Sequence, residues 1–105
     1  MTLPQLKKYD VTQKVIEALA DSESRSILFS IIKKGMTASE LSGRLKIPLS
    51  SVYKKLADLE ELTLIKVEKW MISEKGRKFK IYKSRISKAD ISIRKPDPVL
   101  NLVPN

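Results

Sequence analysis

The chain of 105 residues contains no cysteine and no histidine. Without cysteine it can form neither a disulfide nor a thiolate metal site. Without histidine it also lacks the partner ligand of the common zinc sites, the most frequent general acid–base catalyst and the usual pH switch. It has only three glycines, with no phosphate-binding glycine loop, no G-x-S-x-G and no metal-ligand spacing. We therefore expect no metal, no cofactor and no enzymatic activity.

Long hydrophobic runs are missing as well. No apolar stretch approaches the roughly 20 residues that a bilayer span requires. The opening sequence, MTLPQLKKYD, has no apolar signal-peptide core. We therefore expect a cytoplasmic protein that does not enter a membrane. Its hydrophobic fraction of 42% is enough for the core of one compact domain and excludes a disordered tail.

Positive charge is abundant and unevenly placed. The net charge is +9, and residues 66–88 hold nine basic and two acidic residues, a local net charge of +7. Such an excess favours an anionic partner, either nucleic acid, an acidic membrane surface or an acidic protein. A lysine-rich surface that serves solubility alone is the alternative.

Apolar periodicity predicts two helices in the first third of the chain. Residues 1–9 resemble an arm, and Asp10, with Gln13 three residues later, predicts the start of the first helix. Asp21 or Ser22 is expected to cap the second helix. Gly35 fits the left-handed position that follows a helix end.

Two further helices are predicted in close succession. Residues 37–40, TASE, form a capping-box pattern that opens the third helix. Pro48 suits the first turn of a fourth helix over residues 48–61. Only a very short turn separates the two, so they are expected to cross steeply, as in a helix-turn-helix.

After Leu62 the pattern changes from helical to alternating. Residues 64–73 and 78–86 predict two strands, and Gly76 lies in the short loop between them. Residues 89–93 fit either a further short strand or an extended arm. The end of the chain carries three prolines and is expected to be irregular, with apolar side chains that can dock elsewhere.

The predicted helix 48–61 has an inverted charge pattern. Lys54 and Lys55 lie in its first half, and Asp58, Glu60 and Glu61 lie in its second. The helix macrodipole favours the reverse order. An anion that meets only the first two turns explains the inversion, although an ordinary solvated acidic face is the alternative.

Three helices, a short turn, a fourth helix and a basic hairpin form an order that resembles the winged helix-turn-helix of ArsR- and MarR-like transcription regulators. The resemblance covers roughly residues 10–86 and implies an α+β fold. Residues 87–105 lie beyond it and are a candidate C-terminal strand or tail for contact with a dimer mate or a partner. Small stand-alone proteins of this kind are common in archaea. Lys46 and Thr63 depart from it, since many members have glycine at both places. The matching pattern comprises Glu40, Leu41, Leu45, Ile47, Ser51, Val52, Leu56, Leu59, Leu64 and Ile65.

The resemblance implies that helix 48–61 enters the DNA major groove and that the hairpin is a wing on the flanking backbone or in the minor groove. Helix 48–61 contributes five candidate DNA-binding residues: Ser50, Ser51, Tyr53, Lys54 and Lys55. The wing contributes Lys75, Arg77, Lys78 and Lys80, with Arg77 as the candidate for the minor groove. Thr37 and Ser39 are candidates for holding a phosphate at the start of the third helix.

Several of these residues also have a purely structural interpretation. Ser51 suits packing in the turn, Tyr53 suits the body of the domain, and the capping box alone explains Thr37. Trp70, Phe79, Ile81 and Tyr82 fit base stacking less well than anchoring of the sheet to the helices.

These observations predict a DNA-binding transcriptional regulator that recognises double-stranded DNA as a homodimer. The first helix, residues 89–93 and the apolar tail are the candidate dimer surfaces. One alternative is an interaction module of a larger transcription or replication assembly, docked through the tail. RNA binding is another.

Overall fold

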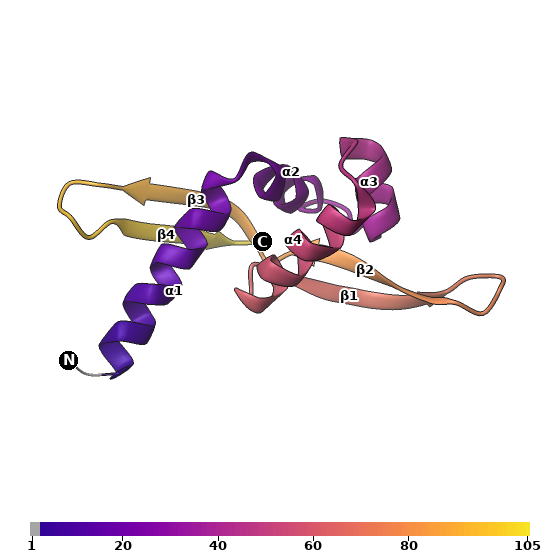
Figure 1. The fold of residues 1–105 in the computed structure, drawn as a ribbon, viewed down its shortest axis with the longest axis horizontal. Helices are drawn as coiled ribbons and strands as arrows, with labels where there is room; N and C mark the ends of the chain where they lie inside the picture. Colours follow the sequence, from indigo (N-terminus) through magenta and orange to yellow (C-terminus); the bar gives the residue numbers. More distant parts are fainter. Residues whose placement is uncertain (1–2) are drawn as a thin grey trace.

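The computed structural model describes the backbone of residues 3–105 and the side chains of residues 11–105. Four helices precede two antiparallel hairpins (Figure 1). The helices are α1 (Leu3–Ala20), α2 (Ser22–Ser30), α3 (Ala38–Leu45) and α4 (Leu49–Glu61), and the strands are β1 (Ile65–Ile72), β2 (Lys78–Ser84), β3 (Ile86–Ser92) and β4 (Val99–Pro104). This architecture confirms the predicted α+β fold, a winged helix-turn-helix. Among the described residues, no helix combines the length and apolarity needed to cross a bilayer.

The hydrophobic core lies where α2, α3 and α4 meet the base of the first hairpin. Helix α4 turns Val52, Leu56 and Leu59 inward, at the spacing that the sequence predicts. Each of these side chains is at most 1% exposed. The opposite face of α4 is therefore left on the surface. The core is completed by Val15, Leu19, Ile27, Leu28, Ile31, Met36, Ala38, Leu41, Ile47, Leu64, Ile65, Tyr82 and Ile86.

Helix α1 is longer than the sequence analysis expected. It begins at Leu3, so the residues from 3 onward that were predicted as an arm are helical and Asp10 lies inside the helix instead of capping it. Pro4 fits this earlier start, because proline is favoured in the first turn of a helix. Val15 and Leu19 are buried, whereas Val11, one turn earlier, is 53% exposed.

The segment between α2 and α3 passes very close to the first hairpin. Asp21 caps α2 as predicted, but the helix already ends at Ser30 and Gly35 does not adopt a left-handed conformation. A Cβ atom on Gly35 would lie 2.6 Å from Cγ2 of Ile81 and 3.0 Å from the backbone oxygen of Tyr82. The glycine is therefore required for close approach to β2 and not for a helix cap. Met36 and Tyr82 exchange two backbone hydrogen bonds there, which tie the start of α3 to the hairpin.

The turns on either side of α4 use left-handed residues that are not glycine. Lys46 has φ 56° and Thr63 has φ 61°. These are the two positions where the sequence departs from the glycines of the family that it resembles. Both turns therefore keep a left-handed residue without glycine. The energetic cost of placing a residue with a Cβ atom in the left-handed region is modest.

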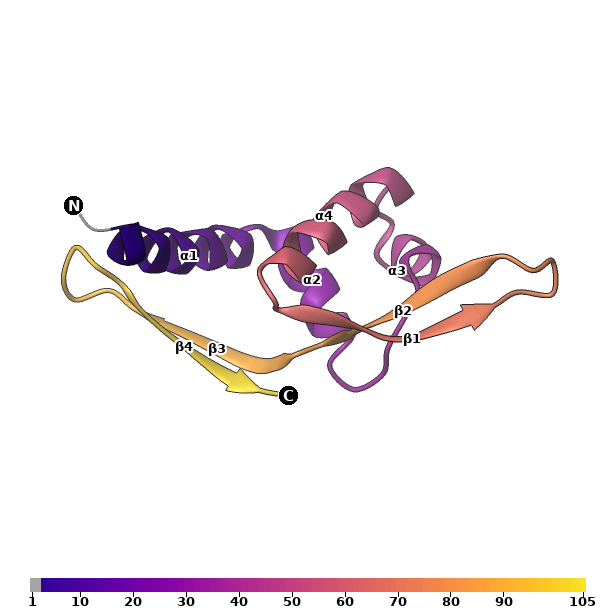
Figure 2. The same cartoon turned by 90° about the horizontal axis from the view of Figure 1, so that it is seen from below.

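The first hairpin projects from the body as an antiparallel β1–β2 wing (Figure 2). Gly76 turns it with φ 79°, as its place in the sequence predicts. The strand register shifts between Val67 and Lys69, which makes a β-bulge at Glu68.

The second hairpin corrects the prediction for the end of the chain. Of the two possibilities for residues 89–93, the structure shows a strand, since residues 89–92 belong to β3. The tail is not irregular, because β4 pairs with β3. Two prolines lie in the connecting loop. Pro104 is the last residue of β4, an edge strand in which a missing N–H is tolerated. Leu100 and Leu102 pack against the core, and the Asn105 side chain donates hydrogen bonds to the backbone oxygens of Ile32 and Ser84.

Candidate nucleic-acid interface

A hollow of about 750 Å³ lies between the start of α3, the exposed face of α4 and the β1–β2 wing. Six of the residues predicted to contact DNA line it, although they come from three separate elements: Thr37, Ser39, Tyr53, Arg77, Lys78 and Lys80. The rest of its lining is Ala38, Ala57, Glu60, Trp70, Ser73, Phe79 and Tyr82. The lining of this concave surface therefore includes three basic and four aromatic residues.

The other predicted contact residues lie outside the lining of this hollow. Ser50 and Lys54 are exposed at the start of α4, and Ser51 is half-buried. Lys75 is exposed in the turn of the wing. These residues extend the candidate surface beyond the hollow, to the start of α4 and to the turn of the wing.

The start of α3 forms the capping box that the sequence predicts. The Thr37 hydroxyl accepts a hydrogen bond from the Glu40 N–H at 3.1 Å, and the Glu40 carboxylate accepts one from the Thr37 N–H at 3.0 Å. The hydrogen bond from the Thr37 N–H to the carboxylate lowers the pKa of Glu40. The Thr37 hydroxyl is thus already used by the helix, whereas Ser39 is exposed. That Thr37 and Ser39 hold a phosphate stays a prediction.

Trp70 is more exposed than an anchor of the sheet would be. Its side chain is 57% exposed, whereas Tyr82 is only 6% exposed and packs in the core. Val67 pairs with Tyr82 and Trp70 pairs with Lys80, so the extra residue between Val67 and Trp70 keeps Trp70 on the same face of the wing as Tyr82. Trp70 is exposed although it shares this face, because its pair lies nearer to the turn of the wing. Irregular alternation in residues 64–73 is the sequence signal for such a bulge.

The acidic half of α4 is split between two sides of the helix. Glu60 lines the hollow beside the cations of the wing. Asp58 and Glu61 instead line a second hollow of about 550 Å³ between α4 and α1. Among the described residues, no group of three or more acidic side chains converges to hold a metal ion.

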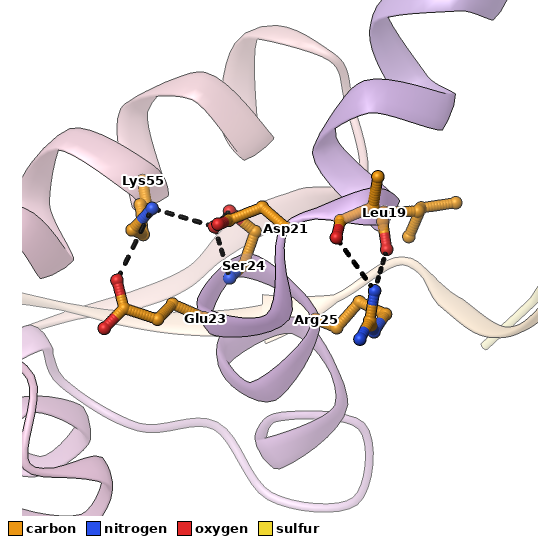
Figure 3. Close-up of polar contacts among 7 residues, drawn as sticks. Leu19, Asp21, Glu23, Ser24, Arg25 and Lys55 are labelled. Carbon is orange, nitrogen blue, oxygen red and sulfur yellow. Dashed lines mark hydrogen bonds and ion pairs between the residues drawn. The ribbon is translucent and has the colours of Figure 1, made fainter.

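Lys55 has a partner within the protein (Figure 3). Its ammonium lies 2.8 Å from Oδ2 of Asp21 and 3.7 Å from Oε1 of Glu23. Asp21 also caps α2 by accepting hydrogen bonds from the backbone N–H and the hydroxyl of Ser24. The predicted DNA contact of Lys55 is untested, but the structure uses this side chain to fix α4 against the start of α2.

The junction between α1 and α2 is held by a second cation. Arg25 donates hydrogen bonds to the backbone oxygens of Leu19 and Ala20, at the end of α1 (Figure 3). A cation at a helix C-terminus satisfies carbonyl groups that have no partner in the helix. Arg25 thus links α2 to the end of α1, and Lys55 links α4 to the start of α2.

The hydrogen bond from Lys55, together with those from Ser24, lowers the pKa of Asp21 from 3.8 to about 2. A carboxyl group with a depressed pKa in the folded state stabilises the fold above its unfolded pKa and loses that contribution as pH falls through the folded value. We therefore expect wild type to be more stable than Asp21→Asn above about pH 5, with the gap closing as the pH falls from about 4 to about 2. Urea unfolding across this pH range measures the gap. A gap of constant size would show that charge on Asp21 is not its cause.

No protein-family model matches the sequence, and no curated protein matches it. The structure, however, is similar to solved structures. It matches the reduced form of HlyU from Vibrio cholerae N16961 with a TM-score of 0.59 and 20% sequence identity, over 79% of this chain and 81% of HlyU. It matches NolR from Sinorhizobium fredii with a TM-score of 0.61 and 17% identity, over 80% of this chain and 78% of NolR.

These likenesses show the fold. The winged helix-turn-helix seen here is thus shared with two proteins of low sequence identity, each matched over about four fifths of its length. Within this winged helix-turn-helix, α3 and α4 form the helix-turn-helix and β1 and β2 form the wing.

Proposed function

We propose that this protein is a cytoplasmic, sequence-specific DNA-binding regulator of transcription, which acts by binding and not by a chemical reaction. The observation that carries the proposal is the hollow. It sets Arg77, Lys78 and Lys80 of the wing opposite the start of α3 and the exposed face of α4. We take α4 as the recognition helix, the helix that enters the major groove. A DNA strand that runs between α4 and the wing meets these cations, and phosphate contacts of this kind fix a protein on a duplex.

The first two turns of α4 are suited to the major groove. Pro48 occupies the N-cap position and supplies no side-chain hydrogen bond to the helix. Ser50, Tyr53 and Lys54 are exposed on the same half of the helix. Hydroxyl and ammonium groups at the start of a recognition helix can bond to base edges or phosphates. We assign sequence recognition to these residues, with Ser51 at their edge.

We also propose that the working unit is a homodimer, formed through α1 and the β3–β4 hairpin. This hairpin lies on the side of the molecule away from the wing and close to α1 (Figures 1 and 2). Several large apolar side chains are exposed on these elements, and covering them favours association. They are Val11, Ile91, Ile93, Val99 and Val103.

The same apolar side chains support a second candidate function, an interaction module of a larger assembly. In that case the β3–β4 hairpin would dock a different protein, and the wing would contact nucleic acid only loosely. Sedimentation of the purified chain separates the two. A dimer mass at micromolar concentration favours the regulator, and a monomer mass favours the interaction module.

Selection from a pool of random duplexes tests sequence-specific binding. We expect enrichment of a motif with two half-sites about one helical turn apart, since two-fold proteins read DNA at this spacing. A Ser50→Ala, Lys54→Ala variant should enrich a less defined motif, because base-edge contacts are lost while the wing is intact. Tight binding without enrichment of any motif would reject sequence-specific regulation.

A further inference from the structure

The only tryptophan of the chain lies on the wing, exposed and next to a cation. Trp70 keeps 57% of its surface exposed, and Nζ of Lys80 lies 5.2 Å from the centre of its ring. Such a cation–π contact is weak at an exposed site. The contact therefore does not explain why a large aromatic side chain is held in solvent, whereas a partner that covers the ring would.

The surroundings of Trp70 combine aromatic and basic groups. Tyr53 lines the same hollow, and Arg77 and Lys78 lie on its wing side. Its volume of about 750 Å³ is large enough for an organic ligand. Aromatic platforms within a positively charged groove are the two features with which proteins hold single-stranded nucleic acids.

A duplex does not use both features. Its bases are stacked on one another, so a double strand that passes the hollow presents phosphates and sugars to it. An unpaired strand presents the flat faces of its bases as well. We infer that the hollow binds an unpaired strand of nucleic acid, with a base stacked on Trp70 and phosphates held by Arg77 and Lys78. This activity goes beyond the proposed function and does not require sequence reading by α4.

Fluorescence of Trp70 reports on such binding directly, because no other tryptophan contributes. We expect a 12-nucleotide oligo(dT) to quench the emission of the full-length protein at low salt. For the variants, anisotropy of the same labelled oligonucleotide gives the affinity. Trp70→Ala should bind roughly 5- to 150-fold more weakly, the range expected for loss of one stacked base. Trp70→Phe should recover part of the loss, because its ring can still stack.

Met71→Ala is the matched control. Met71 follows Trp70 on β1, points to the other face of the strand and is 39% exposed. Its replacement also shortens an exposed apolar side chain, so we expect an affinity within about twofold of wild type. Equal losses in Trp70→Ala and Met71→Ala, or no quenching by any single strand, would overturn the inference.

Parallel titrations with oligo(U) and with a duplex complete the test. Quenching by oligo(dT) or by oligo(U) supports the inference, and the tighter of the two identifies DNA or RNA as the source of the strand. Quenching by a single strand without any duplex binding would reject the proposed regulator but not this site. Duplex binding without quenching by single strands would reject this site alone.

Discussion

Replacing Arg77 and Lys78 by alanine is expected to weaken binding to duplex DNA roughly 60-fold in 0.1 M salt and only about ninefold in 0.3 M salt. Both residues lie on the wing side of the hollow. Each phosphate contact contributes about −0.9 to the slope of log affinity against log salt concentration, so two lost contacts reduce the slope by about 1.8. Fluorescence anisotropy with one labelled duplex across a salt series measures affinity and slope together.

The second hairpin offers a matched control for this experiment. Arg94 and Lys95 are adjacent, exposed and in the loop between β3 and β4, at the opposite end of the molecule (Figure 1). Replacing them by alanine lowers the net charge from +9 to +7, as the wing variant does. Arg94 and Lys95 lie next to the apolar surface proposed for the dimer, so sedimentation of the variant first checks that its mass equals that of wild type. With the mass unchanged, we expect this control to keep the wild-type slope. If both variants lose affinity equally, the protein binds DNA through its overall charge, and the wing has no special role.

Replacing Leu56 by alanine is expected to lower the free energy of unfolding by about 2–5 kcal/mol. Leu56 is 1% exposed and lies on the face of α4 that packs into the core. The truncated side chain leaves a cavity that close-packed neighbours fill only in part. Because a small domain is stable by only about 5–15 kcal/mol, a substantial part of its stability is lost. Urea unfolding followed by circular dichroism measures the change.

Leu49→Ala makes the same chemical change on the same helix at a site that is 41% exposed. We expect it to change the unfolding free energy by less than about 1 kcal/mol, as surface substitutions usually do. Comparable losses at the two positions would mean that burial does not determine which face of α4 holds the fold together.

The sequence predicts the position of those candidate residues that a hairpin or a helix places by itself. Arg77, Lys78 and Lys80 lie on the wing because Gly76 permits the turn before them, and their contact with DNA stays a prediction. The face of the wing on which Trp70 lies could not be predicted from the sequence, because side-chain direction in a strand depends on every residue before it. One bulge reverses the alternation, and periodicity alone gives no position for it.

Lys55 and Glu60 show the same limit on α4. Both lie on a helix whose boundaries and buried face are predicted almost correctly. Their partners are not local, however. Lys55 bonds to Asp21, which is 34 residues earlier, and Glu60 faces a hollow formed by the wing. Helical spacing tells which side chains are exposed but not which element they face.

The sequence by itself determined the features whose interactions lie within a few residues. The capping box of Thr37 and Glu40, the apolar face of α4 and the Gly76 turn are of this kind, because each depends on spacing along one local segment. Only the tertiary structure decided that Gly35 serves close approach to β2, that the last residues pair as β4, and that Trp70 faces the hollow. Each of these depends on which distant segments meet, and that choice is made by burial of the shared core.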